Sequence, residues 1–72
     1  MPRNKTPIAL APLERILKEN GAKRVSDDAL KSFAEYLDRH ARDIASRSIE
    51  FSKHSGRRTV MKEDVVLAEK NI

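Results

Sequence analysis

The sequence contains no cysteine and only two histidines among its 72 residues. Without cysteine the chain can form neither disulfide bonds nor thiolate metal sites, and two histidines alone make a poor metal site. A monomer this short buries little apolar surface, and such cross-links are the usual remedy. Association with a second chain is the remaining source of stability, so we expect an obligate dimer that holds no metal and no other cofactor.

Aromatic residues and long apolar runs are also scarce. The chain has one tyrosine, two phenylalanines and no tryptophan. Proteins that bind single strands or RNA usually stack bases on aromatic side chains, so this composition argues against that mode. No segment is long and apolar enough for a signal peptide or a membrane span, and we therefore expect a cytoplasmic protein with no membrane partner.

Positive charge is in excess. Fifteen lysines and arginines oppose 11 acidic residues, which gives a net charge of +4 and a pI near 9.8. A compact basic protein is attracted to polyanions, chiefly nucleic acid. Since base stacking is disfavoured, the phosphates of a duplex are the expected target.

The spacing of apolar residues predicts an all-α protein with a short, a long and a short helix. We place these helices at 11–20, 27–53 and 61–70, within a single domain at 7–72. A short basic arm at 1–6 precedes the domain and lacks any pattern. The two connections between the helices are basic.

Glycines and small polar residues mark the helix ends. Gly21 and Gly56 suit the left-handed position that often follows the last turn of a helix. Ser26 is a predicted N-cap, and Asp27 and Asp28 follow it in the first turn, where negative charge complements the helix dipole.

The predicted long helix carries an apolar stripe along its whole length. A helix over 27–53 is about 40 Å long at roughly 1.5 Å per residue. It cannot fold back on its own chain, so a partner must cover most of the stripe. The stripe recurs at three- and four-residue steps and consists of Leu30, Phe33, Ala34, Leu37, Ala41, Ile44, Ala45, Ser48 and Phe51.

Three segments give this layout a resemblance to the archaeal histone family, at the family's order and spacing. They read GAKRVSDDA at 21–29, RDIAS at 42–46 and HSGRRTV at 54–60, with Glu63 and Asp64 following. The resemblance covers about residues 7–70. It implies the histone fold, in which two chains pair head to tail in a handshake dimer. It also implies an archaeal chromatin protein that bends and wraps double-stranded DNA to compact the chromosome. Such a protein binds DNA largely without sequence preference. Homodimers, heterodimers with a paralogous histone, and tetramers or larger assemblies on DNA are all compatible with it.

The resemblance also implies a set of DNA contacts, each of which has a plainer alternative. Basic loop residues are often simply solvated, an isolated helical arginine is often just exposed, and a threonine in the second loop could cap the last helix. In the family, the matching residues lie at the DNA edge, and the helical arginine points into the minor groove. The implied contacts are Arg15, Lys23, Arg24, Arg58 and Thr59.

Other positions match residues with structural roles in the family. Arg57 and Asp64 match an ion pair within one chain. Phe51, His54 and Asp64 match a contact between dimers, although His54 could equally act as a cation at the end of the long helix. Gly21 matches a small residue used when dimers stack along DNA.

The chain departs from the family where dimers meet. Four serines fall in the expected contact between dimers, so we expect that contact to be weak without DNA: Ser46, Ser48, Ser52 and Ser55. Of the expected ion pairs between stacked layers, only that of Glu19 with Lys53 can form. Arg39 would meet Lys70 and Glu35 would meet Val66, so we expect poor stacking into long superhelices.

Two further functions compete with chromosome packaging. A histone-fold subunit of a transcription regulator would bind DNA as a heterodimer, and a purely structural helical dimer would bind none. The sequence shows no nucleophile set beside a base, no paired carboxylates and no glycine-rich phosphate loop. We therefore expect no enzymatic activity and no small-molecule substrate.

Overall fold

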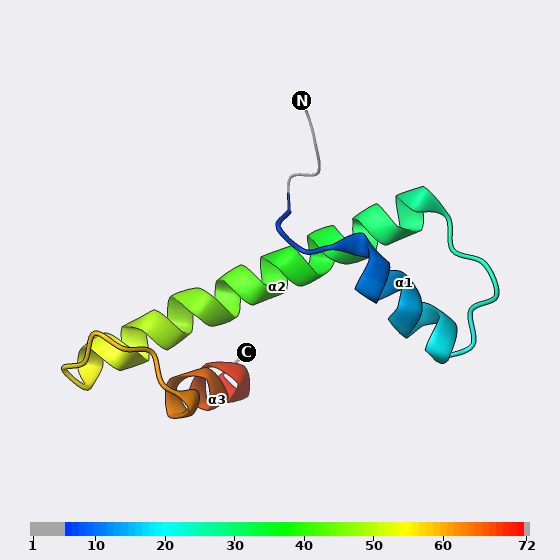
Figure 1. The fold of residues 1–72 in the computed structure, drawn as a ribbon. Helices are drawn as coiled ribbons and strands as arrows, with labels where there is room; N and C mark the ends of the chain where they lie inside the picture. Colours follow the sequence, from blue (N-terminus) through cyan, green and yellow to red (C-terminus); the bar gives the residue numbers. More distant parts are fainter. Residues whose placement is uncertain (1–5, 72) are drawn as a thin grey trace. The chain divides into compact units, whose positions relative to one another are not determined.

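The computed structural model describes residues 6–71, which contain three α-helices and no strand (Figure 1). The all-α prediction is confirmed, and each predicted helix differs from the observed one by a single residue at one or both ends. The predicted arm at 1–6 lies outside the described residues except for Thr6. The helices are α1 (Leu10–Glu19), α2 (Asp27–His54) and α3 (Lys62–Lys70).

The chain forms two compact units, and α2 contributes to both. The first unit extends to Arg39 and the second begins at His40. In the part of the chain that is described, no helix is long and apolar enough to cross a lipid bilayer.

The core of the first unit lies between α1 and the first turns of α2. Leu13, Leu30 and Ala34 are buried there. Pro12 is the third residue of α1, where the backbone needs no N–H donor within the helix. Thr6 is also buried, and its Oγ1 accepts a hydrogen bond from the Ile8 N–H at 3.0 Å. Half-buried apolar side chains complete this core: Ile8, Leu10, Leu17, Val25, Phe33 and Leu37.

A Schellman motif ends α1. The Ala22 N–H donates to the Leu17 carbonyl and the Gly21 N–H to the Lys18 carbonyl, both at 3.0 Å. Gly21 has a φ of +113°, as the sequence predicted. A Cβ at this position would meet no atom within 4 Å, so the backbone conformation, and not crowding within the chain, favours glycine here.

The predicted N-cap of α2 is confirmed. The Ser26 Oγ accepts a hydrogen bond from the Ala29 N–H at 3.0 Å, and the Ser26 carbonyl accepts one from the Leu30 N–H at 3.1 Å. Asp27 and Asp28 occupy the first turn, where their charges face the positive end of the helix dipole.

In the second unit α2 ends on another Schellman motif. Gly56 has a φ of +72°, its N–H donates to the Lys53 carbonyl at 2.9 Å, and the Arg57 N–H donates to the Ser52 carbonyl at 3.0 Å. The chain then reverses into α3, whose Asp64 and Ala68 are buried.

Arg47 connects the two helices of the second unit. Its Nε lies 3.2 Å from the Asp43 carboxylate one turn earlier in α2. Its Nη1 donates to the carbonyl of Asn71, the C-cap of α3, at 3.1 Å. A cation thus lies at the negative end of the α3 dipole.

Much apolar surface of the second unit is uncovered. Ala68 is the only fully buried apolar side chain in the described part of this unit. Along one side runs an apolar groove of about 460 Å³, lined by Ala41, Ile44, Ala45, Ser48, Ile49, Val60 and Val65. We call it the α2–α3 groove. Further apolar side chains of this unit are also exposed, namely Met61, Val66 and Leu67.

Candidate nucleic-acid interface

The connection between α2 and α3, residues 55–61, is held by side chains from both helices. The Ser52 hydroxyl in α2 lies 3.1 Å from the carbonyl oxygens of Arg57 and Thr59 and donates toward both. The Arg57 Nη1 also donates to the Thr59 carbonyl, at 2.9 Å. The loop backbone on either side of Arg58 is therefore fixed.

Asp64 in α3 secures the loop from the other side. Its carboxylate accepts two hydrogen bonds from the Arg57 guanidinium, both at 3.0 Å, and one from the Met61 N–H at 2.8 Å. The residue is only 2% exposed. Since Met61 is the N-cap of α3 and Asp64 its third residue, the carboxylate also satisfies one of the N–H groups at the start of the helix.

These contacts shift the protonation equilibria of both partners. The Arg57 hydrogen bonds, followed by the Met61 N–H, hold the pKa of Asp64 below its usual value. The same side-chain hydrogen bonding raises the pKa of Arg57. Both groups stay charged near neutral pH, and the Arg57 charge is directed at Asp64.

The neighbouring side chains are left at the surface. Arg58 and Thr59 are both exposed. The alternative that Thr59 caps the last helix is wrong, because the N-cap is Met61. In this loop the Thr59 carbonyl has a structural role, while its hydroxyl lies on the exposed side chain.

The first unit presents its predicted basic residues in the connection between α1 and α2. Lys23 and Arg24 are exposed. Gly21 on one side ends α1 through its backbone, and Val25 on the other packs against the core. The two cations thus lie on a short segment that is anchored at both ends.

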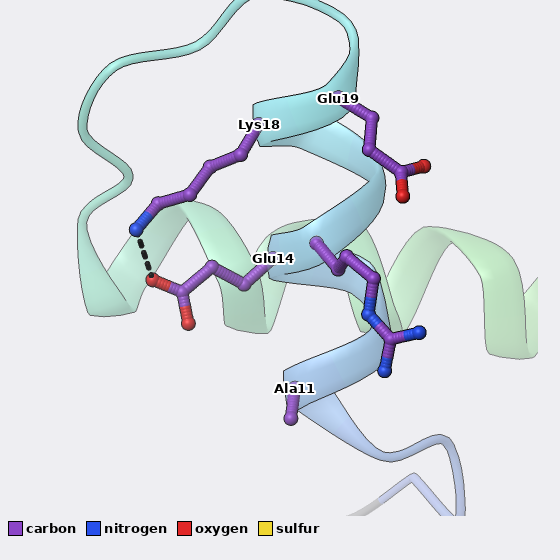
Figure 2. A pocket seen from close by; sticks show the side chains of 5 residues that line it. Ala11, Glu14, Lys18 and Glu19 are labelled. Atoms are coloured by element: carbon purple, nitrogen blue, oxygen red, sulfur yellow. Dashed lines mark ion pairs between the residues drawn. The ribbon is translucent and has the colours of Figure 1, made fainter.

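Arg15 is exposed on α1, among side chains of both signs. Figure 2 shows this face of the helix, where Lys18 turns toward Glu14 at 3.4 Å while Glu19 lies apart from that pair. Over residues 6–71, Arg15 takes part in no ion pair. Within these residues its charge is therefore unpaired, unlike that of Lys18.

The residues predicted for contacts between dimers lie at the end of α2 and in α3. Phe51 is half-buried, His54 is exposed as the last residue of α2, and Asp64 is buried against Arg57. Two of the four serines expected in that contact are buried within their own chain. Ser48 and Ser52 are each 2% exposed and are covered by their own chain. They lie one turn apart in α2, and the weak contact expected between dimers stays a prediction.

Sequence reasoning missed two residues of this region. Ser52 was grouped with the serines of a dimer contact, although its position one turn before Gly56 hints at a loop contact. No prediction was made for Arg47, although its spacing from Asp43 is that of an ion pair on a helix.

The exposed side chains of this region can bind phosphate. The cations can make charge-assisted hydrogen bonds to phosphate oxygens, and the Thr59 hydroxyl can make a neutral one.

The chain is similar to known histones. A family model described as histone-like transcription factor (CBF/NF-Y) and archaeal histone matches residues 6–68. One of the subunits of archaeal histone HAN1 from Thermococcus zilligii is 46% identical over 63 residues, which cover 88% of this chain and 94% of that protein. Probable archaeal histone 3 of Methanocaldococcus jannaschii is 49% identical over 61 residues, covering 85% and 91%. With a family match over most of its length and two relatives at this level of identity, the chain belongs to the family of histone-like transcription factors and archaeal histones.

Proposed function

We propose that this protein is an architectural DNA-binding protein of the chromosome. Its dimers bind the backbone of double-stranded DNA, bend and wrap the duplex largely without sequence preference, and so compact it. Membership of a family that includes archaeal histones supports this function, as does the net charge of +4 on 72 residues. Phosphate contacts dominate binding of this kind and carry little sequence information.

One observation carries the proposal. Arg58 and Thr59 are exposed on a loop whose backbone is fixed by Ser52, Arg57 and Asp64. Fixing the backbone before binding reduces the entropy lost when a phosphate is bound.

The proposed binding unit is a dimer. In the described part of the chain only four apolar residues are buried, namely Leu13, Leu30, Ala34 and Ala68. The α2–α3 groove is apolar and open, and a second copy of the chain is the proposed occupant. Pairing with a paralogous histone, and further assembly through Phe51, His54 and Asp64 or by stacking at Gly21, stay predictions.

Bending a duplex is energetically feasible for such a dimer. Smooth bending of a site of roughly 20–30 base pairs costs on the order of 1–6 kcal/mol. The proposed contacts per chain are Arg15, Lys23, Arg24, Arg58 and Thr59, and a dimer doubles them. Several charge-assisted hydrogen bonds to phosphate offset a cost of this size.

The test is binding to a random-sequence duplex, long enough for several helical turns, at low and moderate salt. We expect affinity to fall by about 10³–10⁵ between roughly 50 and 200 mM salt, if about 6–10 phosphates are contacted. The variant R15A/R24A/R58A should lose most binding while remaining a folded dimer. The matched variant K18A/K31A/K70A, which removes the same charge elsewhere, should lose much less. Absence of binding by the wild type at low salt, or equal losses in the two variants, would contradict the proposal.

A transcription regulator is the second candidate, because the matching family model also covers histone-like transcription factors. A regulator prefers particular sites, whereas a packaging protein binds most sequences alike. Competition between random duplexes and a pool enriched by repeated selection separates the two. Strong enrichment of one sequence would favour the regulator.

A further inference from the structure

We propose that Ser52 is a positioning residue for the DNA contact made by Arg58 and Thr59. The inference rests on the proposed function and adds to it a residue that touches no DNA itself. Ser52 lies in α2 one turn before Gly56, is 2% exposed, and directs its hydroxyl at the loop.

Ser52 holds the loop through both its backbone and its side chain. Its carbonyl accepts the Arg57 N–H at 3.0 Å, and its hydroxyl lies 3.1 Å from the Arg57 carbonyl. The same hydroxyl lies 3.1 Å from the Thr59 carbonyl. Arg58 is therefore bracketed by two peptide groups that point at one buried side chain.

The Thr59 carbonyl joins this contact to the rest of the unit. It accepts from the Ser52 hydroxyl and from the Arg57 Nη1, and that guanidinium is fixed in turn by Asp64. The loop is thus tied to α2 through Ser52 and to α3 through Asp64. With its carbonyl turned inward, Thr59 keeps its side chain at the surface beside Arg58.

Burial makes the Ser52 hydroxyl hard to replace. Water readily takes over a lost hydrogen bond at the surface, but a side chain at 2% exposure leaves little access for it. Without the hydroxyl, Arg57 is the one side-chain donor left to the Thr59 carbonyl among residues 6–71. The peptide groups around Arg58 then sample more conformations, and ordering them on DNA costs affinity.

Ser48 provides a matched control one turn earlier. It is equally buried, at 2%, and its hydroxyl is also hydrogen-bonded. Its acceptor, however, is the Ile44 carbonyl of its own helix, at 2.7 Å, and not the loop. Replacing either serine with alanine removes one buried hydroxyl of the same size, but only S52A frees the loop.

The experiment compares wild type, S52A, S48A, R58A/T59V and S52A/R58A/T59V, all as full chains. Circular dichroism and sedimentation first establish, for each variant, the temperature range over which it is a folded dimer, and binding is measured there. The probe is one random-sequence duplex titrated over a series of salt concentrations. The salt dependence reports the number of phosphate contacts, which a general loss of stability does not change.

We expect S52A to bind DNA about three- to tenfold more weakly, the range that corresponds to one hydrogen bond. Its salt dependence should flatten by roughly 0.9 for each phosphate contact that is lost. S48A should bind like wild type. Adding S52A to R58A/T59V should change affinity by less than about twofold, because the contact that Ser52 positions is already absent.

Three results would overturn the inference: wild-type binding by S52A, an equal loss in S48A, or a full additional loss when S52A is combined with R58A/T59V. If R58A/T59V weakens binding and S52A does not, only the role of Ser52 fails. If the wild type itself does not bind DNA, the proposed function fails and the inference with it.

Discussion

At the scale of single residues, the geometry of the second loop depends most on Asp64. An ionised carboxylate is costly to bury unless its oxygens are paired. Asp64 is 2% exposed and accepts three hydrogen bonds, two from Arg57 and one from the Met61 N–H. The loop geometry therefore depends on this group being charged.

Acid should destabilise the protein through this carboxylate. The Arg57 hydrogen bonds and then the Met61 N–H hold the folded-state pKa of Asp64 below that of an unfolded chain. Its contribution is therefore present above the unfolded value of about 3.9 and is lost as the pH falls through the lower folded value. We expect D64N to unfold at a lower urea concentration than wild type at about pH 7, with the difference shrinking below about pH 4.

The comparison needs a carboxylate that is not buried. D43N removes the exposed partner of Arg47 and should cause only a small change. Chain concentration is kept equal in all samples. A constant gap between D64N and wild type from neutral to acid pH would show that the charge of Asp64 does not stabilise the fold.

At the scale of elements, the connection after α1 and the connection after α2 both begin with a glycine of positive φ. Gly21 and Gly56 are the residues with positive φ in the part of the chain that is described. At each, the chain turns back so that the last helical carbonyls are satisfied by the following N–H groups. The two basic segments therefore start from defined backbone geometries.

Alanine at Gly56 should destabilise the fold by about 1–2 kcal/mol, the cost of a left-handed conformation for a residue with a Cβ. Steric clashes within the chain add nothing to this free-energy cost, because a Cβ at Gly56 would meet no atom within 4 Å. The shift of the urea midpoint at constant slope measures the effect. S55A, at the exposed neighbouring position, is the control and should have little effect. Equal midpoints for G56A and wild type would mean that the turn adopts another conformation at no cost.

At the scale of the whole molecule, the apolar side chains outnumber the places to bury them within one chain. Ile49, Val60 and Val65 line the α2–α3 groove and are each more than 40% exposed. Burial of apolar surface is the dominant favourable term in folding. Covering these side chains with a partner would therefore stabilise the fold.

If a second copy covers them, the melting temperature should rise with chain concentration. A45E places a charge in the α2–α3 groove and should abolish dimerisation and, with it, most helical structure. S46E adds the same charge at an exposed neighbour outside the groove and should stay dimeric. Light scattering and circular dichroism over a range of concentrations measure both properties. A folded monomer whose melting is independent of concentration would contradict the dimer.

The helices were predictable because their signals are local. Ser26, Gly21 and Gly56 act on neighbouring backbone groups, so the sequence alone indicated where α1 and α2 end and where α2 begins. The exposed positions of Arg24 and Arg58 likewise follow from their places in polar loops.

The placement of Ser48 and Ser52 was not predictable in the same way. Helical spacing says that two residues share a face, but it does not say which segment covers that face. The loop that follows α2 contacts Ser52, and the path of that loop depends on Asp64, seven residues beyond Arg57. Contacts of this kind form only when the tertiary structure does.

The open α2–α3 groove has a consequence for the amount of folded protein in the cell. If each chain needs a partner to hide this surface, the amount of folded protein rises more steeply than the number of chains made. Chains in excess of their partners stay unfolded and are degraded by proteases. Two paralogous chains that pair with each other would then settle at matched amounts without dedicated control of their synthesis, since turnover would remove the surplus of either one.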